Sequence, residues 1–357
     1  MEVARWPVGG IRTYLRDLFR ARALKSYRLV LVAPNEEGLD DYISGLKLEC
    51  LEWIRTGSSI AGMTQAASAA VRRLNPILVH SHGFISGVIS GLACQFTRVP
   101  HLQTVHDVLR DEQFRGFRGR MRDLALGLSL ISPGRIHCVT ADSRDNLLTR
   151  YPWLLSLKRK AVVIPHGIEA DTIVLAARRD LAAELSCSSN TVIFGFLGRF
   201  MAQKGFRVLM DAITILKERG LTAERLRVLA VGSGGFLRED RARIESLGLA
   251  PYFTFWAYQP DIASILKGMD CLVMPSLWEA SGLLAMEAMV AGTPVIVTKC
   301  IGLRETLADS PSVQVRPNDP YVLSEAIANF VARPDKQVAI RFQPEAIQRF
   351  SADRSFT

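Results

Sequence analysis

The chain has 357 residues, of which 48% are hydrophobic, and its formal net charge is +9. This length allows two domains of ordinary size, and the apolar content excludes a largely disordered protein. Six cysteines stand far apart, at positions 50, 94, 138, 187, 271 and 300. Their spacing argues against a zinc cluster, a redox pair and a secreted disulfide framework, and it predicts a cytoplasmic protein.

Short β-rich segments alternate with longer helical patterns along the whole chain, which predicts parallel sheets covered by helices. The expected strands of the first half are residues 27–33, 46–53, 77–81, 101–106, 135–140 and 161–165. Those of the second half are residues 192–197, 226–231, 253–258, 271–275, 294–298 and 313–315. We expect two Rossmann-like α/β domains, 1–168 and 169–335, followed by a terminal segment, 336–357.

Ligands of open parallel sheets bind beyond the carboxyl ends of the strands, so two such domains that face each other would form a cleft from their strand-end loops. The longest apolar stretch, residues 76–97, contains His80, His82 and several glycines. It therefore predicts a strand, a turn and a buried helix rather than a membrane span.

The positive charge belongs to the first half of the chain. Residues 1–168 contain 23 Lys+Arg against 14 Asp+Glu, whereas residues 169–357 contain 21 of each. The segment FRGFRGRMR, residues 114–122, alternates Phe114 and Phe117 with four arginines. Such a surface predicts peripheral contact with an anionic membrane, and ordinary solvated arginines are the alternative. Nucleic acid is not an expected partner, because no recognisable nucleic-acid module accompanies the charge.

The segment LGRFMAQKGF, residues 197–206, follows an apolar strand. Gly198 and Arg199 end that strand, and Lys204 with Gly205 opens a helix, so two cations and free backbone N–H groups lie at one strand end. This arrangement predicts a phosphate site, and a surface turn with two solvated cations is the alternative. The next strand ends in VGSGG, residues 231–235, where Gly232 would allow close approach of a ligand, although such turns are common in α/β folds.

The most informative stretch is PSLWEASGLLAMEAMVAGTPVIVT, residues 275–298. After an apolar strand it presents Glu279, and a helix then begins near Ser281 and Gly282. Glu287 lies among apolar residues of that helix, so we expect it to be buried and to need a polar partner. Eight positions along a helix separate the two carboxylates by at most about 12 Å, roughly the span from a ribose across a diphosphate to a sugar. A solvated loop acid at Glu279 and a salt bridge at Glu287 are the alternatives.

Together these segments resemble a known family. They are Gly9-Gly10, TVHD at 104–107, IPHGIE at 164–169, GRFMAQKG at 198–205, VGSGG at 231–235 and PSLWEASGLLAMEAMVAGTPVI at 275–296. The chain is similar in them to the retaining glycosyltransferases of family 4, which have the GT-B fold of two Rossmann-like domains. The similarity covers almost the whole chain.

The resemblance implies a role for each matching residue. Arg199 and Lys204 would hold the diphosphate of a nucleotide-sugar donor, Glu287 the ribose and Glu279 the transferred sugar. Gly10 would lie near the distal phosphate and His106 near the sugar, on the acceptor side. Further donor contacts would come from two groups, the backbone at Ser281, Gly282, Leu283 and Leu284 and the base-holding residues Tyr258 and Gln259.

The implied reaction moves a hexosyl group to a hydroxyl of a glycan or lipid-linked acceptor with retention of configuration, in bacterial-type synthesis of cell-surface polysaccharide or glycolipid. No metal and no cofactor beyond the donor is expected. His80, His82 and His166 also follow strands and would face the cleft, but their spacing does not match a zinc site. For His106, a structural pair with Asp107 is the alternative role.

Two departures from the family pattern concern the ends. Few residues precede Gly9, so the first strand looks short, and the sequence stops at RFSADRSFT, where family members continue into a helix that returns to the first domain. Two other functions therefore stay open: a GT-B scaffold that binds donor weakly and partners an active transferase, and a nucleotide-sugar epimerase on the same fold.

Overall fold

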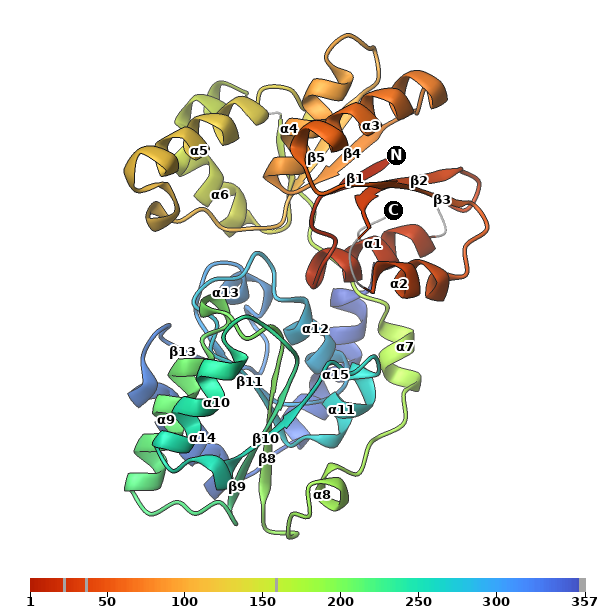
Figure 1. Cartoon of the computed structure of the whole chain (residues 1–357). Coiled ribbons are helices and arrows are strands. Elements are labelled where there is room, and N and C mark those ends of the chain that lie inside the picture. Colours follow the sequence, from red (N-terminus) through yellow and green to blue (C-terminus); the bar gives the residue numbers. More distant parts are fainter. Residues whose placement is uncertain (22–23, 36–37, 158–159, 353–357) are drawn as a thin grey trace. The chain divides into compact units, whose positions relative to one another are not determined.

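The structure is a computed structural model that describes residues 1–21, 24–35, 38–157 and 160–352, with only the backbone described at 155–157. These residues form two compact units, an N-terminal unit, Met1–His166, and a C-terminal unit that begins at Gly167. Each unit is a parallel sheet with helices packed on both faces (Figure 1).

The N-terminal sheet has seven strands in the order β3-β2-β1-β4-β5-β6-β7. Its strands are β1 (Glu2–Ala4), β2 (Leu29–Pro34), β3 (Leu51–Thr56), β4 (Val79–His82), β5 (His101–Val105), β6 (Arg135–Cys138) and β7 (Ala161–Val163). Its helices are α1 (Gly10–Arg20), α2 (Leu39–Leu46), α3 (Ile60–Leu74), α4 (Phe84–Cys94), α5 (Gly116–Ser129) and α6 (Ala141–Arg150), with 3-10 helices η2 (Asp111–Phe114) and η3 (Pro152–Leu157).

The C-terminal sheet has six strands in the order β10-β9-β8-β11-β12-β13. They are β8 (Val192–Leu197), β9 (Leu226–Val231), β10 (Phe253–Trp256), β11 (Cys271–Met274), β12 (Val295–Thr298) and β13 (Val313–Val315). The helices are α7 (Ala170–Leu175), α8 (Leu181–Glu184), α9 (Phe206–Glu218), α10 (Leu237–Ser246), α11 (Ile262–Gly268), α12 (Leu283–Val290), α13 (Leu303–Thr306), α14 (Pro320–Ala332) and α15 (Gln337–Phe350), with 3-10 helices η4 (Ala202–Lys204) and η5 (Ala250–Tyr252).

Strand β8 shows how the sequence buries both faces of the C-terminal sheet. Phe194 and Phe196 point into the core beneath α9 and α14, whereas Ile193 and Leu197 point into the core beneath α11, α12 and α15. Because successive strand residues point to opposite faces, a continuous apolar run is required when both faces are covered. The unbroken run VIFGFL is the sequence signature of this central strand.

The predicted fold class is confirmed, and most predicted strands lie within a few residues of their place. The strand predicted at 46–53 is wrong in its first part, because Leu46 ends α2 and Lys47 adopts a positive φ of 51°, so β3 starts only at Leu51. The strand predicted at 27–33 starts later, at Leu29. A short first strand, β1, pairs with both β2 and β4.

The apolar stretch 76–97 forms β4 and α4, as predicted. Among the described residues, no helix combines the length and the apolar character needed to cross a membrane. The six cysteines are all free thiols.

Phe114 corrects the prediction of a basic and aromatic surface at 114–122. Its side chain is buried in the core beneath α5 and α6, and the guanidinium of Arg150 lies 4.2 Å from its ring centroid. The aromatic residue of that segment on the surface is Phe117, which is 80% exposed.

Candidate functional site

The loops that follow β8 and β11 leave the C-terminal sheet where its strand order reverses. On one side of this point the sheet continues through β9 and β10, and on the other through β12 and β13. Open α/β sheets bind ligands at such a switch point. Gly198, Arg199 and Lys204 follow β8, and Glu279 follows β11, so the fold brings these predicted residues to one edge of the sheet.

Hydrogen bonds to backbone carbonyls hold the two loops together. The backbone N–H of Leu277 donates to the carbonyl of Gln203 at 2.8 Å, and the side-chain Nε2 of Gln203 donates to the carbonyl of Trp278 at 3.0 Å. Gly205 has a φ of +66°, and a Cβ at this position would lie 1.9 Å from the carbonyl oxygen of Pro275. The loops pack this closely because residue 205 has no side chain.

Lys204 and Glu279 form an ion pair between these loops. The ammonium of Lys204 lies 2.6 Å from Oε1 of Glu279. The hydroxyl of Ser276 donates to the same oxygen at 2.8 Å. Glu279 is only 7% exposed, so it is not the solvated loop acid of the alternative interpretation. A buried carboxylate needs a cation and hydrogen-bond donors, and Lys204 and Ser276 supply both.

Arg199 extends the positive charge toward solvent, because its side chain is exposed. Gly198 and Gly232 come into close contact where the loops after β8 and β9 meet. Their φ angles are +143° and +140°, and a Cβ on Gly232 would lie 2.0 Å from the carbonyl oxygen of Gly198. Glycine is therefore required at position 232 by packing alone.

The start of α12 lies beside the Glu279 loop. Ser281 is buried, and its carbonyl accepts a hydrogen bond of 2.7 Å from the hydroxyl of Thr306. Gly282 is the N-cap with a φ of 76°, and the helix begins with the partly buried Leu283 and Leu284. The positive end of the helix dipole adds to the cations nearby.

Glu287 is less buried than predicted. It lies on α12 but is partly exposed, because the helix buries Ala285, Met286, Ala288, Met289 and Val290 and leaves this position at the edge of the packed surface. Its predicted role toward a ribose stays a prediction.

Tyr258 and Gln259 follow β10 on the surface of the C-terminal unit. Tyr258 is 72% exposed. Gln259 lines an open hollow of about 500 Å³ together with Arg179, Glu184, Phe255, Trp256 and Ala257. The guanidinium of Arg179 lies 4.6 Å from the Trp256 ring centroid. The predicted role of Tyr258 and Gln259 toward a base stays a prediction.

The other predicted residues, Gly10 and His106, belong to the N-terminal unit. Gly10 is the exposed first residue of α1, after Gly9 with a φ of 57°. His106 directly follows β5 and is partly exposed. The ring of Tyr14, from α1, lies 5.3 Å from the His106 ring between centroids.

His106 belongs to a larger group of polar side chains on the N-terminal sheet. His80 and His82 are 4% and 3% exposed, so the prediction that they face an open cleft is wrong. His166 is buried as well, with its ring stacked on Tyr14 at 4.6 Å. These histidines lie against α1, which covers them.

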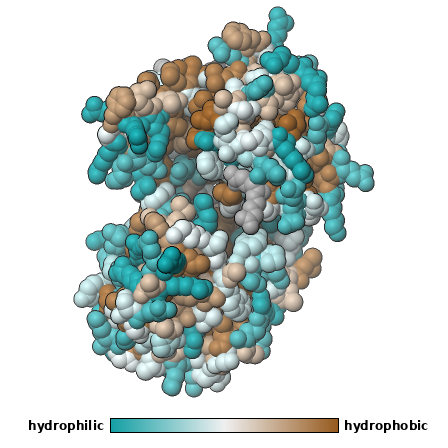
Figure 2. All heavy atoms as spheres, viewed as in Figure 1, coloured by the Kyte–Doolittle hydropathy of each residue, from teal (hydrophilic) through white to brown (hydrophobic). Residues whose placement is uncertain are grey.

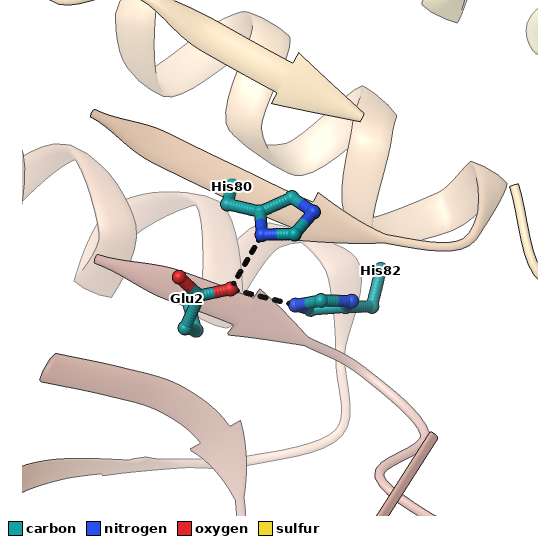
Figure 3. Close-up of side chains that lie close together, drawn as sticks. All are labelled: Glu2, His80 and His82. Carbon is teal, nitrogen blue, oxygen red and sulfur yellow. Dashed lines mark hydrogen bonds and ion pairs between the residues drawn. The ribbon is translucent and has the colours of Figure 1, made fainter. Parts of the chain in front are cut away.

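Glu2 joins two of these histidines, as Figure 3 shows. One oxygen of its carboxylate, Oε2, lies 2.9 Å from Nδ1 of His80 and 2.7 Å from Nε2 of His82. Among the described residues, these three offer ligand atoms close enough together to hold a metal ion. Histidine contacts hold the pKa of the Glu2 carboxyl well below its usual range, although burial alone would raise it.

Glu2 could not be predicted from a motif, because a single carboxylate does not form one. Parallel pairing places Glu2 opposite His80 and Ala4 opposite His82. The spacing of His80 and His82, two residues apart on one strand, does predict that both point to one face. The partner on β1 could be found only from the strand register.

Comparison with known proteins matches both units. Residues 8–172 match the model of Glycosyltransferase Family 4, and residues 191–333 match that of Glycosyl transferases group 1. The chain is 27% identical to D-inositol 3-phosphate glycosyltransferase of Corynebacterium kroppenstedtii, over 93% of this chain and 79% of the relative. It is also 27% identical to 2-deoxystreptamine N-acetyl-D-glucosaminyltransferase of Streptomyces fradiae, over 98% of this chain and 91% of the relative.

Solved structures share the architecture. HepE of Anabaena in complex with UDP-glucose superposes with a TM-score of 0.82 at 19% identity, over 100% of this chain and 98% of that chain. Sucrose-phosphate synthase of Thermosynechococcus elongatus superposes with a TM-score of 0.81 at 19% identity, over 100% of this chain and 96% of that chain. The predicted GT-B fold is thereby confirmed.

Proposed function

The chain belongs to the family 4 glycosyltransferases of the GT-B type, and on this premise we propose that it transfers a hexosyl group from a nucleotide-diphosphate sugar to a hydroxyl acceptor with retention of configuration. The ion pair of Lys204 and Glu279 at the switch point of the C-terminal sheet carries this proposal. It places a cation and a carboxylate in adjacent loops, where a diphosphate and a sugar hydroxyl would need them.

Lys204 has the chemistry for a leaving diphosphate. Its ammonium has three N–H donors, so it can donate to a phosphate oxygen while it still contacts Glu279. Arg199 stands at the start of the same loop with an exposed guanidinium. Negative charge grows on the phosphate as the glycosidic bond breaks, and cations fixed at that position stabilise the transition state more than the ground state.

The proposed transfer breaks the bond between the anomeric carbon and the phosphate oxygen. The acceptor hydroxyl attacks the anomeric carbon from the face that the phosphate leaves, which retains the configuration, and its proton passes to the departing phosphate. The carboxylate of Glu279 would accept a hydrogen bond from a sugar hydroxyl. The transition state resembles an oxocarbenium ion, as in other reactions at an anomeric carbon.

A nucleotide sugar as donor has support from the comparisons. HepE, which shares the fold, was solved with UDP-glucose. The names of two relatives give D-inositol 3-phosphate and 2-deoxystreptamine as their acceptors. We include small polyhydroxylated acceptors of this kind beside the glycan or lipid-linked acceptor, with cell-surface polysaccharide or glycolipid as the product class.

A membrane-bound acceptor has support from the surface of α5. Phe117, Met121, Leu124 and Leu128 are each more than half exposed. Their spacing places them on one stripe of the helix. Figure 2 shows hydrophobic surface, in brown, over this part of the N-terminal unit. The exposed Arg115, Arg118, Arg120 and Arg122 accompany the stripe, so the helix has the character of one that lies on an anionic lipid surface.

The test begins with the donor. Calorimetry with UDP, GDP and ADP and with their sugars identifies the nucleotide, and incubation with the donor and a panel of acceptors follows, including D-inositol 3-phosphate, 2-deoxystreptamine and lipid-linked glycans. NMR of the product gives the anomeric configuration. Binding and transfer with retention support the proposal. A chain that binds no nucleotide sugar is a scaffold, and one that isomerises the donor without an acceptor is an epimerase.

A further inference from the structure

A row of hydrogen-bonded side chains crosses one face of the N-terminal sheet. It runs through Glu2 on β1, His80 and His82 on β4, Thr104 on β5 and His137 on β6. The strand register sets these side chains next to one another, because Glu2 pairs with His80, His82 with Thr104, and Thr104 with His137. His106, beyond the end of β5, lies at the partly exposed end of this row.

The first part of the row fixes the hydrogen bond between His80 and Glu2. Nε2 of His137 must carry a proton, because it contacts the carbonyl oxygen of Ile164 at 2.7 Å. Burial lowers the pKa of His137 to about 4, so the ring is neutral near pH 7 and its Nδ1 accepts the hydroxyl proton of Thr104 at 2.9 Å. The Thr104 oxygen then accepts from Nε2–H of His80 at 2.6 Å.

His80 therefore uses one ring proton on Thr104 and turns its other nitrogen, Nδ1, to the Glu2 carboxylate at 2.9 Å. Two lone pairs would repel each other at this distance, so a proton or a metal ion must lie between them. The ligand atoms are 2.7 and 2.9 Å apart. That separation is typical of hydrogen bonds, whereas ligands around tetrahedral zinc stand about 3.3 Å apart. A hydrogen bond thus joins Glu2 and His80.

The second part of the row leads from Glu2 to His106. The ionised carboxylate accepts Nε2–H of His82 at 2.7 Å. Burial lowers the pKa of His82 to about 4, so its Nδ1 carries no proton near pH 7. Nε2 of His106 lies 3.1 Å from that nitrogen and must donate to it. Burial, with the neighbouring histidines, also holds the pKa of His106 well below its usual value.

We infer that Glu2 and His82 are positioning residues that hold His106 as the neutral tautomer with its proton on Nε2 and a bare Nδ1. His106 then meets the substrate as a hydrogen-bond acceptor. A bare ring nitrogen can accept a hydrogen bond from a hydroxyl of the substrate. An ionised carboxylate or phosphate has no proton to donate, so it would not form a hydrogen bond with this nitrogen. The inference rests on the proposed transfer reaction for its kinetic consequence, but the tautomer can be observed without it.

The tautomer is tested directly by NMR. The chain has six histidines, so labelling with ¹⁵N-histidine gives a spectrum in which protonated and bare ring nitrogens resonate far apart, and the variant His106→Asn identifies the His106 signals. We expect a protonated Nε2 and a bare Nδ1 at pH 7.5. A proton on Nδ1 of His106 would overturn the inference. So would one equivalent of metal in the purified protein that is lost in Glu2→Gln.

Kinetics test the positioning role. His82→Leu should lower kcat/KM for the donor on the order of 10-fold, the size of one lost hydrogen bond. His82→Asn should lower it less, because the amide oxygen lies where Nδ1 was and can accept from His106. In a His106→Ala background, His82→Leu should have no further effect on kcat/KM. An undiminished further loss in that background would show a merely structural role.

His101→Leu is the matched control. His101 is a buried histidine of the same sheet, and its Nε2 lies 2.8 Å from the hydroxyl of Ser81. His101→Leu should lower the thermal stability about as much as His82→Leu does, and it should leave kcat/KM unchanged. An equal kinetic loss in His101→Leu would overturn the inference. Failure of the proposed function is distinguishable, because the wild type would then transfer no sugar whatever tautomer the NMR spectrum shows.

Discussion

The ammonium of Lys204 and the carboxylate of Glu279 lie 2.6 Å apart, and each comes from a loop at the carboxyl end of a central strand. The pair keeps the lysine close to the switch point of the sheet. A donor diphosphate would therefore meet an ammonium that is already placed, and it would share that ammonium with Glu279. Preorganised charge of this kind costs no rearrangement when the leaving group departs.

Lys204→Ala should lower kcat by roughly 10² to 10³, the range for losing one donor to a developing anion. The loss should persist at saturating donor, since the lysine acts mainly in the transition state. Steady-state kinetics with the donor identified by calorimetry measure this effect. An unchanged rate at saturating donor would contradict the role of Lys204.

Lys336→Ala is the control for this substitution. Lys336 forms an ion pair of 2.9 Å with Asp270 in the same unit, and its side chain is as exposed as that of Lys204, 25% against 23%. Lys336 follows α14, away from the loops after β8 and β11. We expect its loss to change stability and to leave the rate of transfer as it was.

Gly205→Ala should destabilise the C-terminal unit more than Gly220→Ala does. Both glycines have a positive φ, +66° and +85°. An alanine at either position would therefore destabilise the fold by about 1 kcal/mol through backbone strain alone. At Gly205 the new Cβ would also lie 1.9 Å from the Pro275 carbonyl, whereas at Gly220 it would meet open space. Gly205→Ala must therefore separate the two loops and should weaken donor binding as well.

Thermal unfolding of both alanine variants, together with calorimetric titration of the donor, measures these differences. Gly220→Ala should bind donor like the wild type. Equal stability of the two variants would mean that the loops after β8 and β11 do not pack as closely as the structure shows.

Acid should destabilise the N-terminal unit selectively, because all six histidines belong to it. Burial lowers the pKa of His82, His101 and His137 to about 4, from an ordinary value of 6.5. Between about pH 6.5 and pH 4 these rings stay neutral in the folded unit and take up protons on unfolding. The free energy of unfolding should therefore fall with falling pH, by about 1.4 kcal/mol per pH unit for each such histidine.

Hydrogen exchange followed by mass spectrometry separates the two units. At pH 5.5 the N-terminal unit should be less protected than at pH 7.5, after correction for the intrinsic exchange rate, and the C-terminal unit should be little changed. Equal losses in the two units would point to a cause other than the buried histidines.

The sequence predicted the C-terminal unit well because its central strands β8 and β11 are continuous apolar runs. The strand Val192–Leu197 is apolar throughout, as burial on both faces of a sheet requires. The helix Phe206–Glu218 is apolar on one side, as burial of one helix face requires. Arg199, Lys204 and Glu279 could be predicted as neighbours, because parallel strands bring their carboxyl ends to one edge. The salt bridge between Lys204 and Glu279 could not be predicted, since it depends on side-chain placement across two loops.

The N-terminal unit was less predictable for two reasons. Glu2 lies in a strand of three residues, Glu2–Ala4, which is too short to show alternation. Its role emerges only from the register with His80. Phe114 and Phe117 lie in one repetitive basic segment, yet one is buried and the other exposed, because Phe114 belongs to a 3-10 turn that precedes α5. Composition does not distinguish them.

The exposed stripe of α5 should bind anionic membranes. We expect the chain to sediment with vesicles that contain phosphatidylglycerol and much less with neutral phosphatidylcholine vesicles at low salt, because Arg118 and its neighbours attract anionic headgroups while Phe117 and Leu124 enter the apolar boundary. The double variant Phe117→Ser/Leu124→Ser should bind at least on the order of 10-fold more weakly, since burying one large apolar side chain contributes about 1.5–3 kcal/mol.

Leu175→Ser, at a leucine of the C-terminal unit that is 84% exposed, is the control and should bind like the wild type. Equal binding to both kinds of vesicle would reject membrane contact through this helix, and equal weakening by Leu175→Ser would show that the stripe on α5 is not the site.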